Sequence, residues 1–440
     1  MDTPPQAEVT LTLAAKPALL PLAVSEAEQA AYVFGLGKEE ALSLTLAVEE
    51  IFSYLCRFAA PDREIRIKWK GAGYYVETEF SFRSDAFNMR AFNLTASLSP
   101  DDEASLDESG LLIASRMMDR FEFAETDGLL RVTLIKERSY PPADEIGPAQ
   151  AQVLSEFLIR SPHPEELKLS VLRAEAAYGR PYTPPAFRFP GKIADMAAVG
   201  DIFAFVVADA VGHIGGAVFW QWDRGRLVRL FGPYVFGLPA DSGAAERLVE
   251  ECISTLAKTP AVGILSEYPT QDLPKGYFEP LGCLRAGGFK GSPDEPPAQY
   301  RHLQEDSGAG VWAHPSIEPF LRAEYSRLVF AREILSVRDD GEECSPFAVL
   351  SAEFDRPRGT VRLHPVWWGA DSAKTVTAYV ETLRNEGFDQ ILFTMDTGKP
   401  WHARFAPALL AAGFEPRIVL PHAGKGDVVV FQHVTEENES

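Results

Sequence analysis

Two adjacent carboxylates, Glu49 and Glu50, stand in the middle of an apolar run at residues 42–59, LSLTLAVEEIFSYLCRFA. The apolar residues of this run recur with the period of an amphipathic helix: Leu44, Val48, Ile51, Phe52 and Leu55. A carboxylate on the rim of such a face can act as a general base toward a water or a hydroxyl. It can equally be a solvated edge residue, and the sequence favours that second interpretation.

The segments around this helix predict an α+β sandwich over residues 1–140. Alternating apolar and polar residues indicate strands, and a hairpin turns at Asp127-Gly128. The predicted strands are 7–15, 63–71, 74–83 and the two arms of the hairpin, RFEFAET and LLRVTLIKER; the predicted helices are 25–34, 42–59 and 110–119.

Two segments of this region carry a family resemblance. Ala47-Val48-Glu49-Glu50 and GLLIASRMMDRFEF (110–123) resemble the anti-sigma-factor serine kinase branch of the GHKL (histidine-kinase-like) ATPases over residues 7–138. The resemblance implies that Glu50 is the general base and that Gly110 belongs to a glycine loop beside ATP and Mg²⁺. It also implies that this domain recognises anti-sigma antagonist or sigma-type proteins.

The same region departs from the family where the nucleotide would bind. Tyr54 stands at the position of the Asn that holds Mg²⁺, and a phenol is a poor ligand for that ion. The loop at 82–87, FRSDAF, has no glycine, and its Asp is shifted to Asp85. We therefore expect the fold to be retained without binding of ATP and Mg²⁺.

A Pro-rich linker at 141–155 precedes a second predicted domain at 156–304. Its expected elements are a strand at 157–160, a helix at 164–178, a hairpin at 201–222, a strand at 226–236, a helix at 246–257 and a strand at 261–269. A loop with small residues, Ala240-Asp-Ser-Gly-Ala-Ala245, leads into the second helix. Backbone amides at such a helix N-terminus can bind an anion.

This order resembles the GNAT acyl-CoA N-acyltransferases. The resemblance implies that Ser242, Gly243, Ala244 and Ala245 bind the pyrophosphate of acetyl-CoA or another acyl-CoA. Ala240 replaces the family's leading basic or amide residue, and Asp241 adds negative charge.

The catalytic groups of that family are less well matched. The general-acid tyrosine position, four residues before Gly282, is Phe278, and Tyr277 lies one position away. Glu267, at the end of a predicted strand, is the candidate base.

Residues 305–440 are predicted to be a second, more divergent copy of this domain. Ala-Asp-Ser tripeptides at 240 and 370 precede a helix, a strand and a small-residue helix that ends at Gly282 or Gly413. A long helix is expected at 315–335. Ala373 replaces Gly243 in this copy, which makes it less suited to CoA.

Composition limits the possible partners and location. The 440-residue chain has a formal net charge of −21, which argues against binding to nucleic acid or to an anionic membrane. Four separated cysteines without a CxxC pair suggest neither zinc nor disulfides, and no metal site is expected. No signal peptide or membrane span is expected, so the predicted location is the cytoplasm.

Three functional hypotheses follow. The first is a regulatory protein with a degenerate kinase-like domain and acyltransferase-like domains that sense a ligand or dock a protein. The second is an acyl-CoA-dependent N-acyltransferase acting through residues 156–304. The third is a serine kinase or ATPase that uses Glu50.

Overall fold

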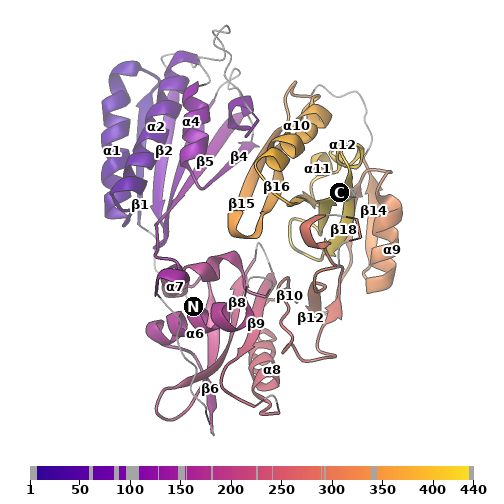
Figure 1. Ribbon diagram of the computed structural model, residues 1–440. Helices are drawn as coiled ribbons and strands as arrows, with labels where there is room; N and C mark the ends of the chain where they lie inside the picture. The colour runs from indigo at the N-terminus through magenta and orange to yellow at the C-terminus, as the bar shows by residue number, and fades with distance from the viewer. Residues whose placement is uncertain are drawn as a thin grey trace. The chain divides into compact units, whose positions relative to one another are not determined.

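Figure 1 shows the computed structural model of the protein. It describes residues 7–58, 63–83, 89–95, 109–126, 128–146, 154, 156–179, 182–223, 226–239, 241–288, 290–291, 294–337 and 344–435.

The chain divides into two compact units. The smaller unit comprises Met1–Ser139, Glu343–Glu353 and Leu363–Thr382; the larger comprises Tyr140–Glu342, Phe354–Arg362 and Leu383–Ser440. The four-part division at 1–140, 141–155, 156–304 and 305–440 stays a prediction.

The smaller unit contains a five-stranded sheet in the order β1-β2-β3-β5-β4, and each strand is antiparallel to its neighbours. The strands are β1 (Glu8–Ala14), β2 (Glu64–Gly71), β3 (Tyr75–Phe82), β4 (Arg120–Thr126) and β5 (Leu129–Glu137). The helices of this part of the chain are η1 (Pro17–Leu19), α1 (Leu20–Val33), α2 (Lys38–Phe58), η2 (Met89–Phe92) and α4 (Ser109–Met117).

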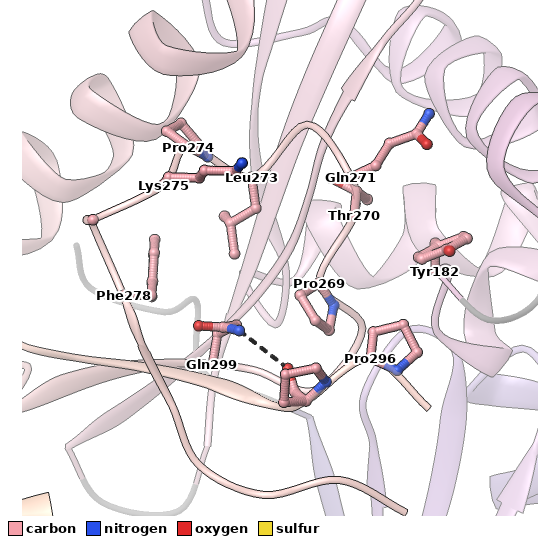
Figure 2. A pocket seen from close by; sticks show the side chains of 12 residues that line it. Tyr182, Pro269, Thr270, Gln271, Leu273, Pro274, Lys275, Phe278, Pro296 and Gln299 are labelled. Carbon is pink, nitrogen blue, oxygen red and sulfur yellow. Dashed lines mark hydrogen bonds between the residues drawn. The ribbon is translucent and has the colours of Figure 1, made fainter. Parts of the chain in front are cut away.

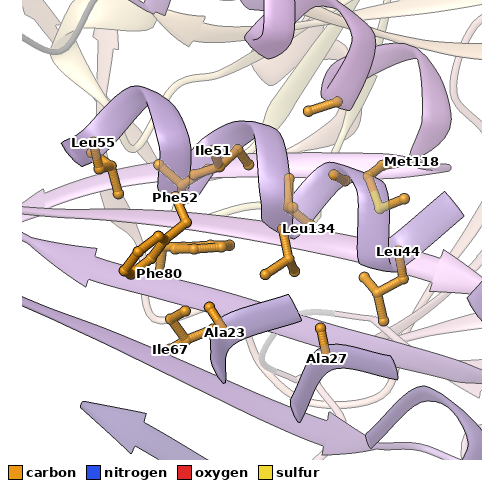
Figure 3. Packing of buried hydrophobic residues seen from close by; sticks show 14 of the residues in the cluster. Ala23, Ala27, Leu44, Ile51, Phe52, Leu55, Ile67, Phe80, Met118 and Leu134 are labelled. Carbon is orange, nitrogen blue, oxygen red and sulfur yellow. The ribbon is translucent and has the colours of Figure 1, made fainter. Parts of the chain in front are cut away.

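The apolar stripe of α2 forms the centre of this unit's core. All five of its predicted core residues are at most 1% exposed: Leu44, Val48, Ile51, Phe52 and Leu55. In Figure 3, Phe52 points from the helix toward Phe80 and Ile67 of the sheet, and Ile51 belongs to the same buried cluster. On β3 every second residue is buried, so one face of the sheet meets the helices. The predicted helix and the predicted strand pattern are confirmed.

Segments from the C-terminal half of the chain complete the smaller unit. They supply parts of β15 (Val349–Asp355), β16 (Thr360–Trp367) and α10 (Ser372–Asn385), each of which continues into the larger unit. Val349 is fully buried in the same cluster as the α2 stripe.

The larger unit begins with a seven-stranded sheet in the order β11-β12-β10-β9-β8-β7-β6. Its strands are β6 (Leu158–Arg160), β7 (Phe203–Ala208), β8 (Ile214–Trp222), β9 (Leu227–Val235), β10 (Gly263–Ser266), β11 (Glu279–Pro280) and β12 (Gln299–His302). The helices of this region are α5 (Ala143–Ile146), α6 (Pro164–Tyr178), η3 (Pro185–Arg188), α7 (Pro190–Ala198), α8 (Ala244–Leu256) and η4 (Ala286–Gly288). The neighbours β9 and β10 are parallel, and the other paired neighbours are antiparallel.

The rest of the larger unit contains two smaller sets of paired strands. Strands β13 (Ala309–Ala313) and β14 (Arg332–Ser336) are parallel, whereas β19 (Val428–His433) pairs antiparallel with β17 (Gln390–Asp396) and β18 (Phe414–Leu420). The helices of this region are α9 (Glu318–Leu328), η5 (Arg356–Arg358), α11 (Pro400–Ala403) and α12 (Ala406–Ala411).

Of two further predicted helices, one is shorter than expected and the other is wrong. The helix expected at 315–335 ends at Leu328, because Val329 adopts a left-handed conformation and Arg332–Ser336 pairs with β13 instead. No helix ends at Gly282, since Glu279 and Pro280 pair with β12. The helix before Gly413 is confirmed as α12.

Candidate functional site

The parallel strands β9 and β10 are paired over three residues and then separate. Leu227, Val228 and Arg229 lie opposite Gly263, Ile264 and Leu265, and β10 then ends at Ser266. Strand β9 continues to Val235 and remains paired with β8. Ligands of sheets with parallel strands commonly bind where two such strands separate at their carboxyl ends.

A β-bulge lies in the part of β9 that extends beyond its pairing with β10. The register with β8 shifts between the pairs Ala217–Tyr234 and Phe219–Phe231, so β9 has one more residue there than β8. Gly232, at the bulge, has a φ of +94°, a conformation that favours glycine. Bulges bend a strand and often lie beside functional sites.

Where β9 extends beyond β10, its edge on the side away from β8 forms hydrogen bonds with side chains of the protein. The amide of Val235 donates a hydrogen bond to the Tyr178 hydroxyl at 2.6 Å, and the Thr270 hydroxyl donates to the Pro233 carbonyl at 2.8 Å. The Tyr178 hydroxyl in turn donates to the Asp272 carboxylate. Burial, followed by this hydrogen bond, raises the pKa of Tyr178, so the hydroxyl keeps its proton. Nothing in the sequence pattern marked these three side chains.

The first turn of α8 gathers the four residues predicted to bind an anion. Gly243 caps the helix with a φ of +69°, and the Ser242 hydroxyl accepts a 3.4 Å hydrogen bond from the Ala244 amide. Within the described residues, the amides of Gly243, Ala245 and Glu246 have no protein acceptor. These amides, together with the helix dipole, can receive an anion.

Two properties set how well this turn suits an anion. A Cβ added at Gly243 would meet no atom within 4 Å, so the side of the backbone on which that Cβ would lie is not covered. The acidic side chains Asp241 and Glu246 flank the turn and oppose a negative ligand. Ala240, at the predicted basic position, lies outside the described residues.

Glu267, the predicted base, holds two guanidinium groups. One of its carboxylate oxygens pairs with Arg229 of β9, and the other lies 3.4 Å from Arg362. Arg229 also pairs with Asp223 at 2.7 Å. This network joins the separating strands, and it leaves Glu267 poorly placed to accept a proton from a substrate. The prediction of a general base at Glu267 stays untested.

Tyr277, beside the expected general-acid position, is also engaged. Its hydroxyl lies 2.7 Å from the Glu250 carboxylate and 3.0 Å from that of Glu246, both on α8. These hydrogen bonds fasten the segment after β10 to that helix.

In the smaller unit, the structure brings together Glu50 and Gly110, the two residues that the kinase resemblance singled out. The half-buried Glu50 carboxylate lies against the first turn of α4, where a Cβ added at Gly110 would be 2.1 Å from its Oε2 atom. Tyr54, at the position of the metal-binding Asn, is 2% exposed and its ring lies 4.4 Å from that of Phe58. The predicted loop at 82–87, including Asp85, falls mostly outside the described residues.

The smaller unit also contains a buried polar network that the sequence did not indicate. The Asn93 amide nitrogen donates to the Ala348 carbonyl at 2.8 Å, and its oxygen accepts from the Leu350 amide at 3.0 Å. The Tyr379 hydroxyl donates to the Leu350 carbonyl at 2.7 Å and accepts from the Leu94 amide at 2.8 Å. The segment after η2 is thereby fixed to β15 and α10.

The described residues offer neither a membrane-spanning helix nor a metal site. In that part of the chain no helix has both the length and the apolar character needed to cross a membrane. The same residues contain no group of three or more His, Cys, Asp or Glu side chains placed to hold a metal ion.

No protein-family profile matches the chain, and none of the curated proteins does. Several solved structures of GNAT acetyltransferases are similar to about a third of it. The GNAT family N-acetyltransferase YhbS from Escherichia coli, in complex with CoA, is 16% identical over 36% of this chain and 84% of that one, with a TM-score of 0.23.

Two further structures give similar values. A GNAT superfamily phosphinothricin acetyltransferase from Sinorhizobium meliloti, in complex with AcCoA, is 16% identical over 35% of this chain and 91% of that one, with a TM-score of 0.27. A GNAT family acetyltransferase from Staphylococcus aureus is 16% identical over 34% of this chain and 100% of that one, with a TM-score of 0.26.

Proposed function

We propose that residues 156–304 bind an acyl-CoA, and that the protein is a cytoplasmic regulator in which this domain senses the ligand. The observation that carries the proposal is the first turn of α8, whose amides at Gly243, Ala245 and Glu246 are unpartnered among the described residues. This helix packs on the sheet that contains the two separating parallel strands β9 and β10. A pyrophosphate bound there would accept hydrogen bonds from the amides of Gly243 and Ala245.

The residues of this domain suit the pyrophosphate of acyl-CoA better than they suit its extended arm. The α8 turn offers unpartnered backbone amides to the pyrophosphate. The edge of β9, which could bind the extended arm of CoA as an added strand, already bonds with Tyr178 and Thr270. The arm therefore has to displace Tyr178 or follow another route. This cost favours a sensor over an efficient catalyst.

The N-terminal domain supplies the regulatory output in this proposal. We assign to it the fold of the anti-sigma-factor serine kinases and a docking role toward an anti-sigma antagonist or a sigma-type protein. Support comes from the position of Glu50 on α2 against Gly110, together with the burial of Tyr54. A buried phenol at the Mg²⁺ position argues against a serine kinase or ATPase acting through Glu50.

N-acyl transfer by residues 156–304 is the second candidate, and the separating strands with a bulge in β9 favour it. In that reaction an amine nitrogen attacks the thioester carbon, the CoA thiolate leaves and a base takes the amine proton. Glu267 would have to release Arg229 or Arg362 to act as that base. We therefore expect any transfer to be slow.

Calorimetric titration of the full-length protein separates these functions. Binding of acetyl-CoA with no acetylation of added amines supports the sensor, and binding with acetylation supports the transferase. Binding of ATP that requires Mg²⁺ contradicts the assignment of a docking domain without phosphotransfer. Absence of acetyl-CoA binding contradicts the proposal as a whole.

A further inference from the structure

A pocket of about 360 Å³ lies beyond the carboxyl end of β10 in the larger unit (Figure 2). This volume is within the range that binds small organic molecules. Figure 2 shows Phe278 and Tyr182 on opposite sides of the pocket. Prolines form much of the remaining wall: Pro269, Pro274, Pro296 and Pro297. The lining is thus mainly apolar, with two aromatic rings and fixed proline backbones.

The segment that forms one wall, residues 267–278, is held at several points. Thr270 binds the β9 carbonyl of Pro233, and Asp272 accepts from Tyr178 of α6. Further along, Tyr277 binds Glu250 of α8. Because its wall is anchored to a strand and two helices, the pocket is formed before any ligand arrives, which lowers the entropy cost of binding.

The charge of the lining is unusual for so acidic a chain. The chain carries 63 Asp and Glu residues against 42 Lys and Arg, yet Lys275 is the sole charged side chain among the described residues that line the pocket. The acids of the wall segment are engaged elsewhere, Glu267 with two arginines and Asp272 with Tyr178. An anion that enters therefore meets an ammonium group and no lining carboxylate.

Neutral polar groups complete the lining. Gln271 and Gln299 contribute amide groups, and the Gln299 amide nitrogen donates to the Pro297 carbonyl at 3.3 Å. In Figure 2, Lys275 lies beside Leu273 on the edge opposite Pro269. A ligand with an anionic end and an apolar body would place its anionic end at Lys275 and its apolar body against the aromatic and proline side chains.

We propose that this pocket binds a small carboxylic acid with an aromatic body. The carboxylate pairs with the Lys275 ammonium group, and the ring of the ligand packs on the aromatic and proline side chains of the lining. The pocket and the first turn of α8 share no lining residue, so either assignment can fail without the other.

The test uses phenylacetate and phenylethylamine as probes, two molecules that differ in the charge of the group beside the same ring. Saturation-transfer NMR and calorimetry on the full-length protein measure their binding. We expect phenylacetate to bind and phenylethylamine to bind at least about tenfold more weakly, since its ammonium group faces Lys275. Equal binding of the two probes, or no binding of phenylacetate, overturns the proposal.

Variants locate the bound probe. Lys275 lies exposed at the pocket, so Lys275→Met should weaken phenylacetate about threefold, whereas Lys258→Met, on an exposed site after α8, should not change its affinity. Gln271→Trp, at the exposed rim, should exclude the probe without disturbing the core. If phenylacetate binds the Lys275→Met variant and the Gln271→Trp variant as tightly as it binds the unsubstituted protein, the assignment to this pocket is overturned.

Discussion

The Asn93 side-chain oxygen and the Tyr379 hydroxyl lie 3.1 Å apart in the smaller unit, although 286 positions separate the two residues. Asn93 is 5% exposed and Tyr379 is fully buried. The amide of Asn93 meets β15 much as a neighbouring strand would, through one donor and one acceptor. The smaller unit therefore contains both the N-terminal sheet and a segment that lies far from it in the sequence.

A double-mutant cycle tests this relationship. Asn93→Ala leaves the Leu350 amide and the Ala348 carbonyl without partners, which should lower the free energy of unfolding by about 2 kcal/mol. Tyr379→Phe removes the acceptor of the Leu94 amide and should cost about 1 kcal/mol. Urea unfolding should show that the double variant loses less than the sum. Simple additivity would mean that the two side chains act independently.

A pair of glycine substitutions in the smaller unit tests the position of Glu50. The Cβ of Gly110→Ala meets the flexible end of Glu50, which can move aside, so we expect the stability to change by less than about 1 kcal/mol. The Cβ of Gly369→Ala would lie 2.2 Å from the Phe347 carbonyl carbon, which cannot move aside, so the loss should exceed about 2 kcal/mol. Thermal unfolding of the two variants compares them directly. A loss for Gly110→Ala as large as that for Gly369→Ala would place Glu50 in a fixed, constrained position.

Tyr178→Phe should change stability and ligand affinity in opposite directions. Loss of the hydroxyl leaves the Val235 amide without its acceptor and Asp272 without its donor, which should cost about 1–2 kcal/mol of unfolding free energy. The same loss frees the edge of β9, so acetyl-CoA should bind more tightly. Thermal unfolding and calorimetry measure the two effects. Weaker acetyl-CoA binding in this variant would show that Tyr178 supports the ligand and does not compete with it.

His433 should make the larger unit less stable in mild acid. Burial, with Arg384 donating to its Nδ1 atom at 3.2 Å, lowers the pKa of His433 from 6.5 to about 4. The unfolded chain therefore takes up the proton first, and the unfolding free energy falls as the pH drops from 6.5 toward 4, by up to about 3 kcal/mol. Above pH 6.5 the imidazole is neutral in both the folded and the unfolded chain, so it adds no pH dependence to the unfolding free energy.

Substitution isolates that contribution. Urea unfolding of His433→Asn should show a smaller loss of stability between pH 6.5 and 4 than the unsubstituted protein shows. His314→Asn, in the loop before α9, serves as the control and should keep the original pH dependence. An identical pH dependence in all three proteins would exclude His433 as the source.

The elements with strong local periodicity could be predicted from the sequence. The stripe of α2 and the hairpin at Gly128 need no information from elsewhere in the chain, because a 3.6-residue period or a turn motif specifies each of them. The helix start at residues 242–245 could be predicted as well, since small residues before an amphipathic helix indicate its N-terminus.

Features that depend on distant segments could not be predicted. The parallel pairing of β13 with β14 converts the end of an expected helix into a strand, and no local pattern signals it. Asn93 and Tyr178 look like ordinary loop and helix residues until β15 and β9 come beside them. The engagement of Glu267 by Arg229 and Arg362 likewise joins three separate segments.

The most direct test of the proposed function places a charge on the first turn of α8. Ala245→Glu adds a carboxylate where the pyrophosphate of acetyl-CoA would bind, and an acid in a first helical turn does not destabilise the helix. Ser254→Glu adds the same charge at an exposed site near the other end of α8. In calorimetric titrations, we predict that acetyl-CoA binds the unsubstituted protein and Ser254→Glu alike, and Ala245→Glu at least about tenfold more weakly. Equal affinity of Ala245→Glu, or no binding to the unsubstituted protein, would contradict the account.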